Sequence, residues 1–230
     1  MYRTVFRDSG MVGGDRFWEF KGDSHNKVQA ERGARINPLG LKQGSQLFGG
    51  DFGYFDTTNG AGKGTFKALQ AWKVSAVNGT TSFRLYKDDF THDLKVLGDV
   101  ILAIAPSLAA GTKTAATVTG VQFTAANITE GDDYYELTGT ITGIAVDNVI
   151  VMADATGAGA NVLVPNVNAV LSEPVYFERT PTLDYVANKG YEEKRGAVYY
   201  KIGILQAAKV IPPYVLQLNT YINNTHIFSL

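Results

Sequence analysis

The sequence predicts a mainly β protein: a β-sandwich or small-barrel domain with an extended irregular N-terminal arm and a short mixed α/β C-terminal region. Two observations carry this prediction. Over residues 66–178, short segments rich in Val, Ile, Thr and Tyr alternate with turn clusters, a spacing typical of sandwiches and barrels. Residues 1–65, in contrast, contain just over half of the 25 glycines and show no sustained helical or alternating period. The remaining residues, 179–230, change character again.

The β region contains a strong hairpin signal at Asn78-Gly79. The segments "FKALQAWKVSAV" and "TTSFRLYK" flank this dipeptide, as strands flank a tight two-residue turn. Phe83 and Leu85 alternate with Arg84 and Tyr86, the pattern of a half-buried strand. Further along, "DVILAIA" and "NVIVMADA" have the composition of buried strands. We therefore expect residues 66–178 to fold as a β domain without the arm.

The N-terminal region combines glycine-rich backbone with spaced aromatic side chains. Disordered chains are poor in aromatic residues, because aromatic burial offsets the entropy lost on ordering. Two interpretations remain open: an arm that lies across another protein, or an irregular lobe packed on its own domain. In the first, the interface anchors are Phe17, Trp18, Phe20, Phe48, Phe52, Tyr54 and Phe55.

The C-terminal region is predicted to mix short helices with a strand. A short helix is expected near residues 183–189, ended by Gly190, and "GAVYYKIGIL" has the composition of a strand. Pro212 and Pro213 then interrupt the chain, and a second short helix is expected after them.

Composition excludes several classes of function. The formal net charge is −1, so no basic excess favours nucleic-acid binding. Cysteine is absent, which excludes disulfides, cysteine-bound zinc and thiol catalysis. Charged residues near the start do not fit a secretory signal, and the apolar run "VILAIAP" is too short to span a bilayer. We expect neither a nucleic-acid nor a membrane partner.

One motif suggests nucleotide binding, but its context does not fit. The string "GAGKGT" around Lys63 resembles the phosphate-binding loop of small nucleotide kinases. The spacing of such loops puts their first glycine at position 57, where this chain has Thr57, and no buried strand precedes the string. We predict a turn that binds no nucleotide.

Other candidates for chemistry have a structural interpretation beside the functional one. His92 lies near three aspartates, an arrangement that suits either acid–base or metal chemistry but is typical of a solvated turn. The acidic stretch "TEGDDYYE" lacks the spacing of a calcium loop. Trp72 and the pair Tyr134-Tyr135 suit either sugar stacking or a core. We therefore predict no catalytic, metal-binding or cofactor-binding residues and no enzymatic activity.

Several longer stretches resemble a known family. They are "FRLYKDDFTHDLKVLGDVILAI", "ATVTGVQF", "YYELTGTITGIAVDNVIVMADATGAGANVLVPN" and "GAVYYKIGILQAAKVIPPYVLQL". In these stretches the chain, over roughly residues 80–230, resembles capsid-associated structural proteins of tailed bacteriophages, of the head-fibre or head-decoration type found in crAss-like and other Bacteroidetes phages. The resemblance does not include residues 1–65.

The resemblance implies a non-enzymatic virion protein that is assembled in the host cytoplasm and attached to the capsid. Its implied partners are the major capsid protein and other virion proteins, with a homo-oligomer as the expected state and the arm as the docking element. Two alternatives remain: a carbohydrate-binding or adhesin-type β module, and a nucleotide-binding enzyme that uses the Lys63 loop.

Overall fold

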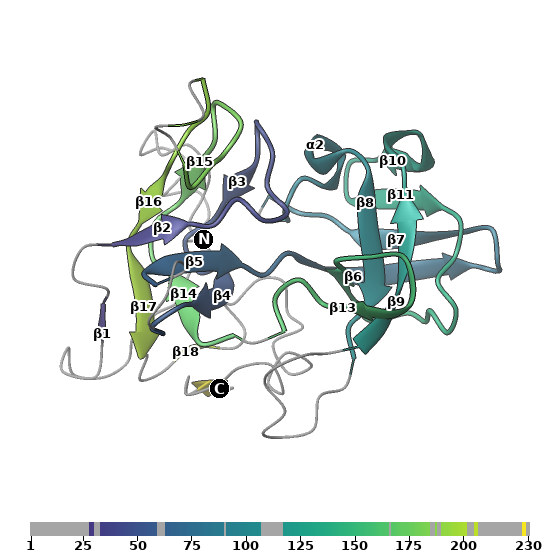
Figure 1. The fold of residues 1–230 in the computed structure, drawn as a ribbon. Helices are drawn as coiled ribbons and strands as arrows, with labels where there is room; N and C mark the ends of the chain where they lie inside the picture. Colours follow the sequence, from purple (N-terminus) through teal and green to yellow (C-terminus); the bar gives the residue numbers. More distant parts are fainter. Residues whose placement is uncertain are drawn as a thin grey trace.

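A computed structural model describes residues 28–29, 33–58, 63–89, 91–106, 117–165, 167–184, 187, 190–201, 205–206 and 227–228. Strands dominate this part of the chain, which confirms the mainly β prediction (Figure 1). The strands of the first sheet are β1 (Val28–Gln29), β2 (Ala34–Ile36), β4 (Phe52–Phe55), β5 (Thr65–Ala68), β14 (Ala169–Leu171), β16 (Arg195–Gly196) and β17 (Val198–Lys201).

The second sheet has eight strands, formed by the middle of the chain. They are β6 (Ala71–Asn78), β7 (Ser82–Tyr86), β8 (Val100–Ile104), β9 (Thr117–Phe123), β10 (Ile128–Glu130), β11 (Tyr134–Thr138), β12 (Val149–Met152) and β13 (Gly157–Asn161). The remaining elements are β3 (Gln46–Leu47), β15 (Val175–Tyr176), β18 (Leu205–Gln206), β19 (Ile227–Phe228), the helix α2 (Leu94–Leu97) and the 3-10 turn η2 (Ala125–Asn127). β3 pairs with β15, and β18 pairs with β19.

The first sheet closes on itself. β16 pairs with β2 at one end of the strand order, whereas β17 pairs with β14 near the other end. Only Ala197 separates β16 from β17, so one continuous segment, 195–201, joins both ends. The ring of strands β2, β5, β4, β14 and 195–201 is named the host barrel here. Its interior includes Phe55, Phe66 and Leu171.

The second sheet, β6 to β13, is named the inserted sheet, and it is also strongly curled. In its strand order β7 and β9 are separated by three strands, yet the rings of Phe83 and Phe123 meet edge to face at 5.6 Å. The chain also passes from the end of β9 to β10, at the opposite side of the order, through η2 alone. Curling lets one face enclose a core that includes Trp72, Phe83 and Phe123.

The inserted sheet interrupts the host barrel in sequence. The chain leaves the barrel after β5 and returns at β14, and everything in the second sheet lies between these two strands. Figure 1 shows the two sheets side by side. A third cluster, named the junction core, packs host residues such as Phe52 and Val170 against Val149 and Val151 of β12. The two sheets therefore pack against each other through this shared core.

Strand pairing divides the chain differently from the sequence prediction. Residues 33–65, assigned to an irregular arm, supply β2, β3 and β4 of the structure. The expected boundary at residue 65 is the first residue of β5. Segments 34–68 and 169–201 form one barrel, although they were assigned to three different regions. The rest of the proposed arm, apart from β1, lies outside the described residues.

The predicted hairpin is present, with a different turn. β6 and β7 pair, and Asn78 is itself a strand residue opposite Ser82. The turn consists of residues 79–81, and Gly79 has a φ of +60°. Glycine adopts this backbone conformation without the steric cost that a side chain would add. The dipeptide thus located the hairpin but not the turn residues.

Candidate functional site

The aromatic residues assigned to the arm fall into two groups. Phe48, Phe52 and Phe55 are buried in the chain's own cores, and Tyr54 packs partly buried against the junction core. For these the lobe interpretation applies, because a side chain inside its own barrel is not available to anchor a partner. Phe17, Trp18 and Phe20 lie outside the described residues.

A buried polar pair links the host barrel to the inserted sheet. Nε2 of His92 lies 2.8 Å from Oδ2 of Asp51, and the two side chains are 4% and 0% exposed. Asp51 Oδ2 also accepts from the backbone N–H of Phe48 at 2.8 Å, which holds the turn before β4. The Phe48 ring stacks on His92 at 5.8 Å. His92 is therefore a junction residue rather than part of a solvated turn.

Trp72 belongs to the same junction. It is 0% exposed, its Nε1 donates to the backbone carbonyl of His92 at 3.0 Å, and its ring meets the imidazole edge to face. Sugar stacking needs an accessible aromatic face, so burial excludes Trp72 from that role. The core interpretation is correct for this residue.

The tyrosine pair is also engaged internally. Tyr135 is buried, and its pKa is raised by burial and by the nearby carboxylates of Asp93 and Glu130, so its hydroxyl stays protonated. Tyr134 carries the Arg84 guanidinium at 4.2 Å from its ring centroid. A Cβ added to Gly131 would lie 2.6 Å from the Tyr134 ring, so the backbone of Gly131 lies close to this ring. Neither ring is a free stacking platform.

The acidic clusters form ion pairs and caps. Glu130 pairs with Lys87 at 2.5 Å, and Asp93 caps α2 by accepting from the backbone N–H groups of Lys95 and Val96. Within the described ranges, no three His, Asp or Glu side chains are arranged to hold a metal ion. These carboxylates therefore have structural partners.

The Lys63 loop joins two antiparallel strands. It connects β4 to β5, and the backbone N–H of Gly64 closes this hairpin by donating to the carbonyl of Asp56. The carbonyl of Gly64 accepts from Arg35 of the neighbouring strand β2. A phosphate-binding loop instead leads from a strand into a helix, whose N-terminus faces the anion. Here the element that follows is β5. Residues 59–62 of the motif lie outside the described part.

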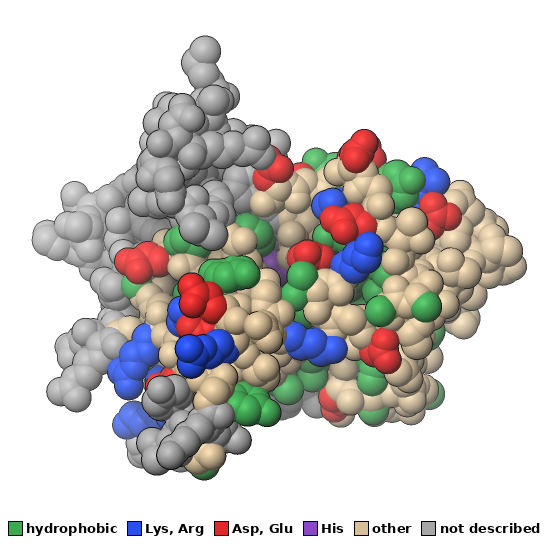
Figure 2. Space-filling view, turned by 90° about the horizontal axis from the view of Figure 1, so that it is seen from above, with side chains coloured by type: hydrophobic (Ala, Val, Ile, Leu, Met, Phe, Trp, Pro, Cys, Tyr) green, Lys and Arg blue, Asp and Glu red, His purple; other side chains and the backbone are tan. Residues whose placement is uncertain are grey.

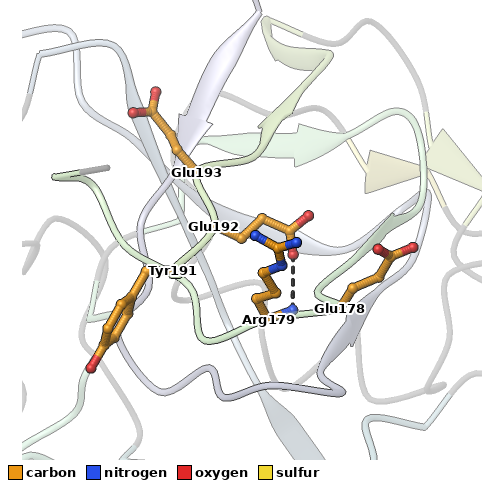
Figure 3. A pocket seen from close by; sticks show the side chains of 5 residues that line it. All are labelled: Glu178, Arg179, Tyr191, Glu192 and Glu193. Carbon is orange, nitrogen blue, oxygen red and sulfur yellow. Dashed lines mark hydrogen bonds between the residues drawn. The ribbon is translucent and has the colours of Figure 1, made fainter. Parts of the chain in front are cut away.

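A polar pocket of about 460 Å³ lies in the segment that connects β14 to β16. Its lining residues are Glu178, Arg179, Tyr191, Glu192 and Glu193 (Figure 3). The close-up shows Arg179 and Glu192 in the middle of the group, with Tyr191 to one side and Glu178 to the other. Tyr191 is 41% exposed. No sequence motif marked these residues, because they converge through a loop.

The charged groups of the pocket are held by neighbours. Glu192 accepts from the backbone N–H of Arg179 at 3.1 Å and pairs with Lys194 at 2.5 Å. Burial alone would raise the pKa of Glu192, but Lys194 and the N–H groups outweigh it and the pKa is lowered. Glu193 pairs with Arg35 at 2.9 Å. Ion pairs therefore hold the carboxylates of Glu192 and Glu193 in position.

The visible surface is mixed in charge. Figure 2 shows acidic and basic side chains interspersed, with hydrophobic side chains scattered among them. Such a surface offers no extended field of one sign to a charged polymer. No helix in the portion of the chain that the structure describes is long and apolar enough to cross a membrane.

Comparisons with known proteins identify no relative. No family model, no curated protein and no solved structure matches the chain.

Proposed function

We propose that the chain is a non-enzymatic structural protein of a tailed-phage virion, attached to the capsid as a head fibre or a decoration protein. Its docking element is the segment that precedes β1, with Phe17, Trp18 and Phe20 as anchors. The major capsid protein is the proposed partner, and a homo-oligomer the proposed state.

The position of β1 is the observation that carries this proposal. Val28 and Gln29 form the outermost strand of the first sheet, paired only with β17 in the strand order. Among the described residues, β1 therefore lies at a sheet edge rather than inside the ring of the host barrel. Three aromatic residues follow one another closely in the segment that precedes β1, and aromatic anchors dominate the energetics of many interfaces.

Further support comes from how the described residues are used. The buried side chains of Asp51 and His92 pair with each other and connect the two sheets. The resemblance over roughly residues 80–230 points to the same class of protein.

Incorporation into particles tests the proposal. The double variant Trp18→Ala/Phe20→Ala should show reduced incorporation into particles, measured by mass spectrometry of purified virions, with an unchanged melting temperature. Tyr86→Ala is the matched control, since Tyr86 is an exposed aromatic residue of β7. If the double variant melts many degrees lower but still incorporates once folded, the aromatic residues belong to the chain's own core and the docking proposal is wrong.

A further inference from the structure

The chemistry of the β14–β16 pocket suits one class of ligand. Glu178, Glu192 and Glu193 offer hydrogen-bond acceptors, while Arg179 offers donors. A hydroxyl group can serve both, because it donates and accepts. The exposed ring of Tyr191 adds an apolar face with a polar tip. The pocket therefore matches a ligand with many hydroxyl groups and apolar C–H faces.

Charge argues against the other simple classes. Three carboxylates and one guanidinium line the pocket, and Lys194 and Arg35 pair with two of the carboxylates, so no excess of positive charge attracts a phosphate chain. A cationic ligand is also disfavoured, because Lys194 and Arg35 already neutralise Glu192 and Glu193 at 2.5 and 2.9 Å. A neutral ligand requires no such excess of charge. The volume of about 460 Å³ is within the usual range for small-ligand pockets.

Arg35 joins the pocket to a second loop. Its guanidinium bonds Glu193 and the carbonyl of Leu183, both in the loop between β14 and β16. Its backbone N–H donates to Gly64, in the loop between β4 and β5, at 3.0 Å. The two loops therefore flank β2. Gly64 lies beside the start of β2, because β5 runs parallel to it, and Lys194 lies beside the end of β2, because β16 runs antiparallel to it.

The barrel surface between two such loops is a recurrent binding position. Read from β14, the host barrel pairs its five strands in the cyclic order of an OB-type barrel, with β2 and β5 as the one parallel pair among the five. OB-type barrels bind oligonucleotides and oligosaccharides between the first–second and fourth–fifth strand loops. The described parts of the corresponding connections are residues 172–184, 187 and 190–194 and residues 56–58 and 63–64, and Arg35 bonds to both.

We propose that this pocket binds a neutral oligosaccharide. Tyr191 stacks on the C–H face of a sugar ring, and Glu178 and Arg179 hydrogen-bond its hydroxyl groups. Lys194 and Arg35 act as positioning residues, because they fix Glu192 and Glu193. The proposed sugar site is therefore not at Trp72 or Tyr134, which contact other residues of the chain. It lies in a loop that no sequence pattern marked.

Glycan-array screening of the full chain, followed by titration calorimetry with the best neutral glycan, tests the proposal. Tyr191→Ala should weaken binding by about threefold to tenfold, as expected for loss of an aromatic contact. Glu178→Gln should also weaken it. Tyr86→Ala is the matched control, because Tyr86 is an exposed tyrosine of β7 outside the pocket and outside both loops, and this variant should bind as wild type does.

Three outcomes would overturn the inference. The first is that wild type binds no neutral glycan on the array. The second is that Tyr191→Ala, with an unchanged melting temperature, keeps full affinity. The third is that a single-stranded oligonucleotide competes for the pocket, which would make an anion the ligand. None of these outcomes bears on capsid docking, which the double variant in the N-terminal segment tests separately.

Discussion

At the scale of single residues, the buried pair Asp51–His92 is a polar contact that stabilises the junction. Both side chains are removed from water. The Phe48 ring stacks on His92, and Asp51 lies directly before β4. Removing one partner of such a pair leaves a buried polar group without compensation, which costs far more than losing a surface pair. The junction should therefore be sensitive to either residue.

Asp51→Ala should lower the free energy of unfolding by about 1–3 kcal/mol, because the buried His92 ring and the backbone N–H of Phe48 would lose their hydrogen-bond partner. Chemical denaturation measures the change. Lys73→Ala is the control: Lys73 pairs with Asp147 at the surface, and its loss should cost about 1 kcal/mol or less. Equal losses in the two variants would show that the junction pair has no special weight.

Asp154 links stability to pH. The backbone N–H and side-chain amide of Asn161 donate to its carboxylate at 2.7 and 3.2 Å, and these bonds lower its pKa. A lowered folded-state pKa stabilises the fold above the unfolded-state value of about 3.9, and this contribution disappears as the pH falls through the folded-state pKa.

Asp154→Asn should therefore melt below wild type near neutral pH, and the difference should vanish in acid, at pH values below both pKa values of Asp154. A series of thermal melts against pH measures this convergence, with Asp132→Asn as a control in another turn. A gap that stays constant down to acid pH would mean that the Asn161 bonds do not depend on the carboxylate charge.

At the scale of elements, two of the host strands, β4 and β14, bury side chains on both faces. In β14, Ala169 and Leu171 face the barrel interior while Val170 packs into the junction core. In β4, Phe55 and Phe52 divide between the same two cores. Strands buried on both sides show no alternation of apolar and polar residues. The missing alternation in β4 is one reason why the sequence predicts an irregular arm for this region.

β4 also requires a residue without a side chain at position 53. A Cβ added to Gly53 would lie 2.2 Å from the carbonyl oxygen of Lys67 and 2.5 Å from the Phe66 ring. The carbonyl belongs to the paired strand β5 and cannot move without breaking the ladder. Gly53 therefore permits the close approach of two strands at the barrel wall.

Gly53→Ala should prevent closure of the host barrel and give a chain without a cooperative melt, or one destabilised by several kcal/mol. Gly64→Ala is the comparison, since an added Cβ there meets nothing within 4 Å and only its positive φ of 77° is strained, at about 1 kcal/mol. Circular dichroism and calorimetry separate the two. Similar melting of both variants would contradict the steric explanation.

Sequence reasoning succeeded where periodicity is local. The hairpin of β6 and β7 has alternating burial, with Phe83 and Leu85 inside, as the pattern predicted. Closure of the host barrel depends instead on strands of two to four residues paired across more than a hundred positions, such as Arg35 with Arg195. Such short strands have too few residues to specify a partner. No motif marked the pocket, because its lining residues converge through a loop rather than through a patterned strand or helix.

At the scale of the whole molecule, the chain consists of a host barrel interrupted by an inserted sheet. The inserted sheet has its own core and local hairpins, and it meets the host through the junction core and the His92 pair. The host barrel, by contrast, needs segments from both sides of the insertion. We therefore expect independent folding of the inserted sheet rather than of a region that begins after residue 65.

A fragment of residues 69–168 should fold with a cooperative melt, at a lower temperature than the full chain because its junction face becomes exposed. A fragment of residues 66–230 retains β14, β16 and β17 but lacks β2 and β4, so it should be less soluble. Circular dichroism and size-exclusion chromatography compare them. An unfolded 69–168 fragment beside a folded 66–230 fragment would reverse this assignment.

The discontinuous host barrel also has a consequence for biosynthesis. A ribosome that has completed β5 must still translate residues 69–168 before β14 exists, and must reach residues 195–201 before the ring closes. At translation rates of about 5–20 residues per second, the nascent strands β2, β4 and β5 wait several seconds for β14 and segment 195–201, which complete the ring. During that interval Phe52, Phe55 and Phe66 are accessible to chaperones or to neighbouring nascent chains, while the inserted sheet, emerging whole, can fold first. The order of synthesis thus makes the inserted sheet the surface on which the host barrel is later completed.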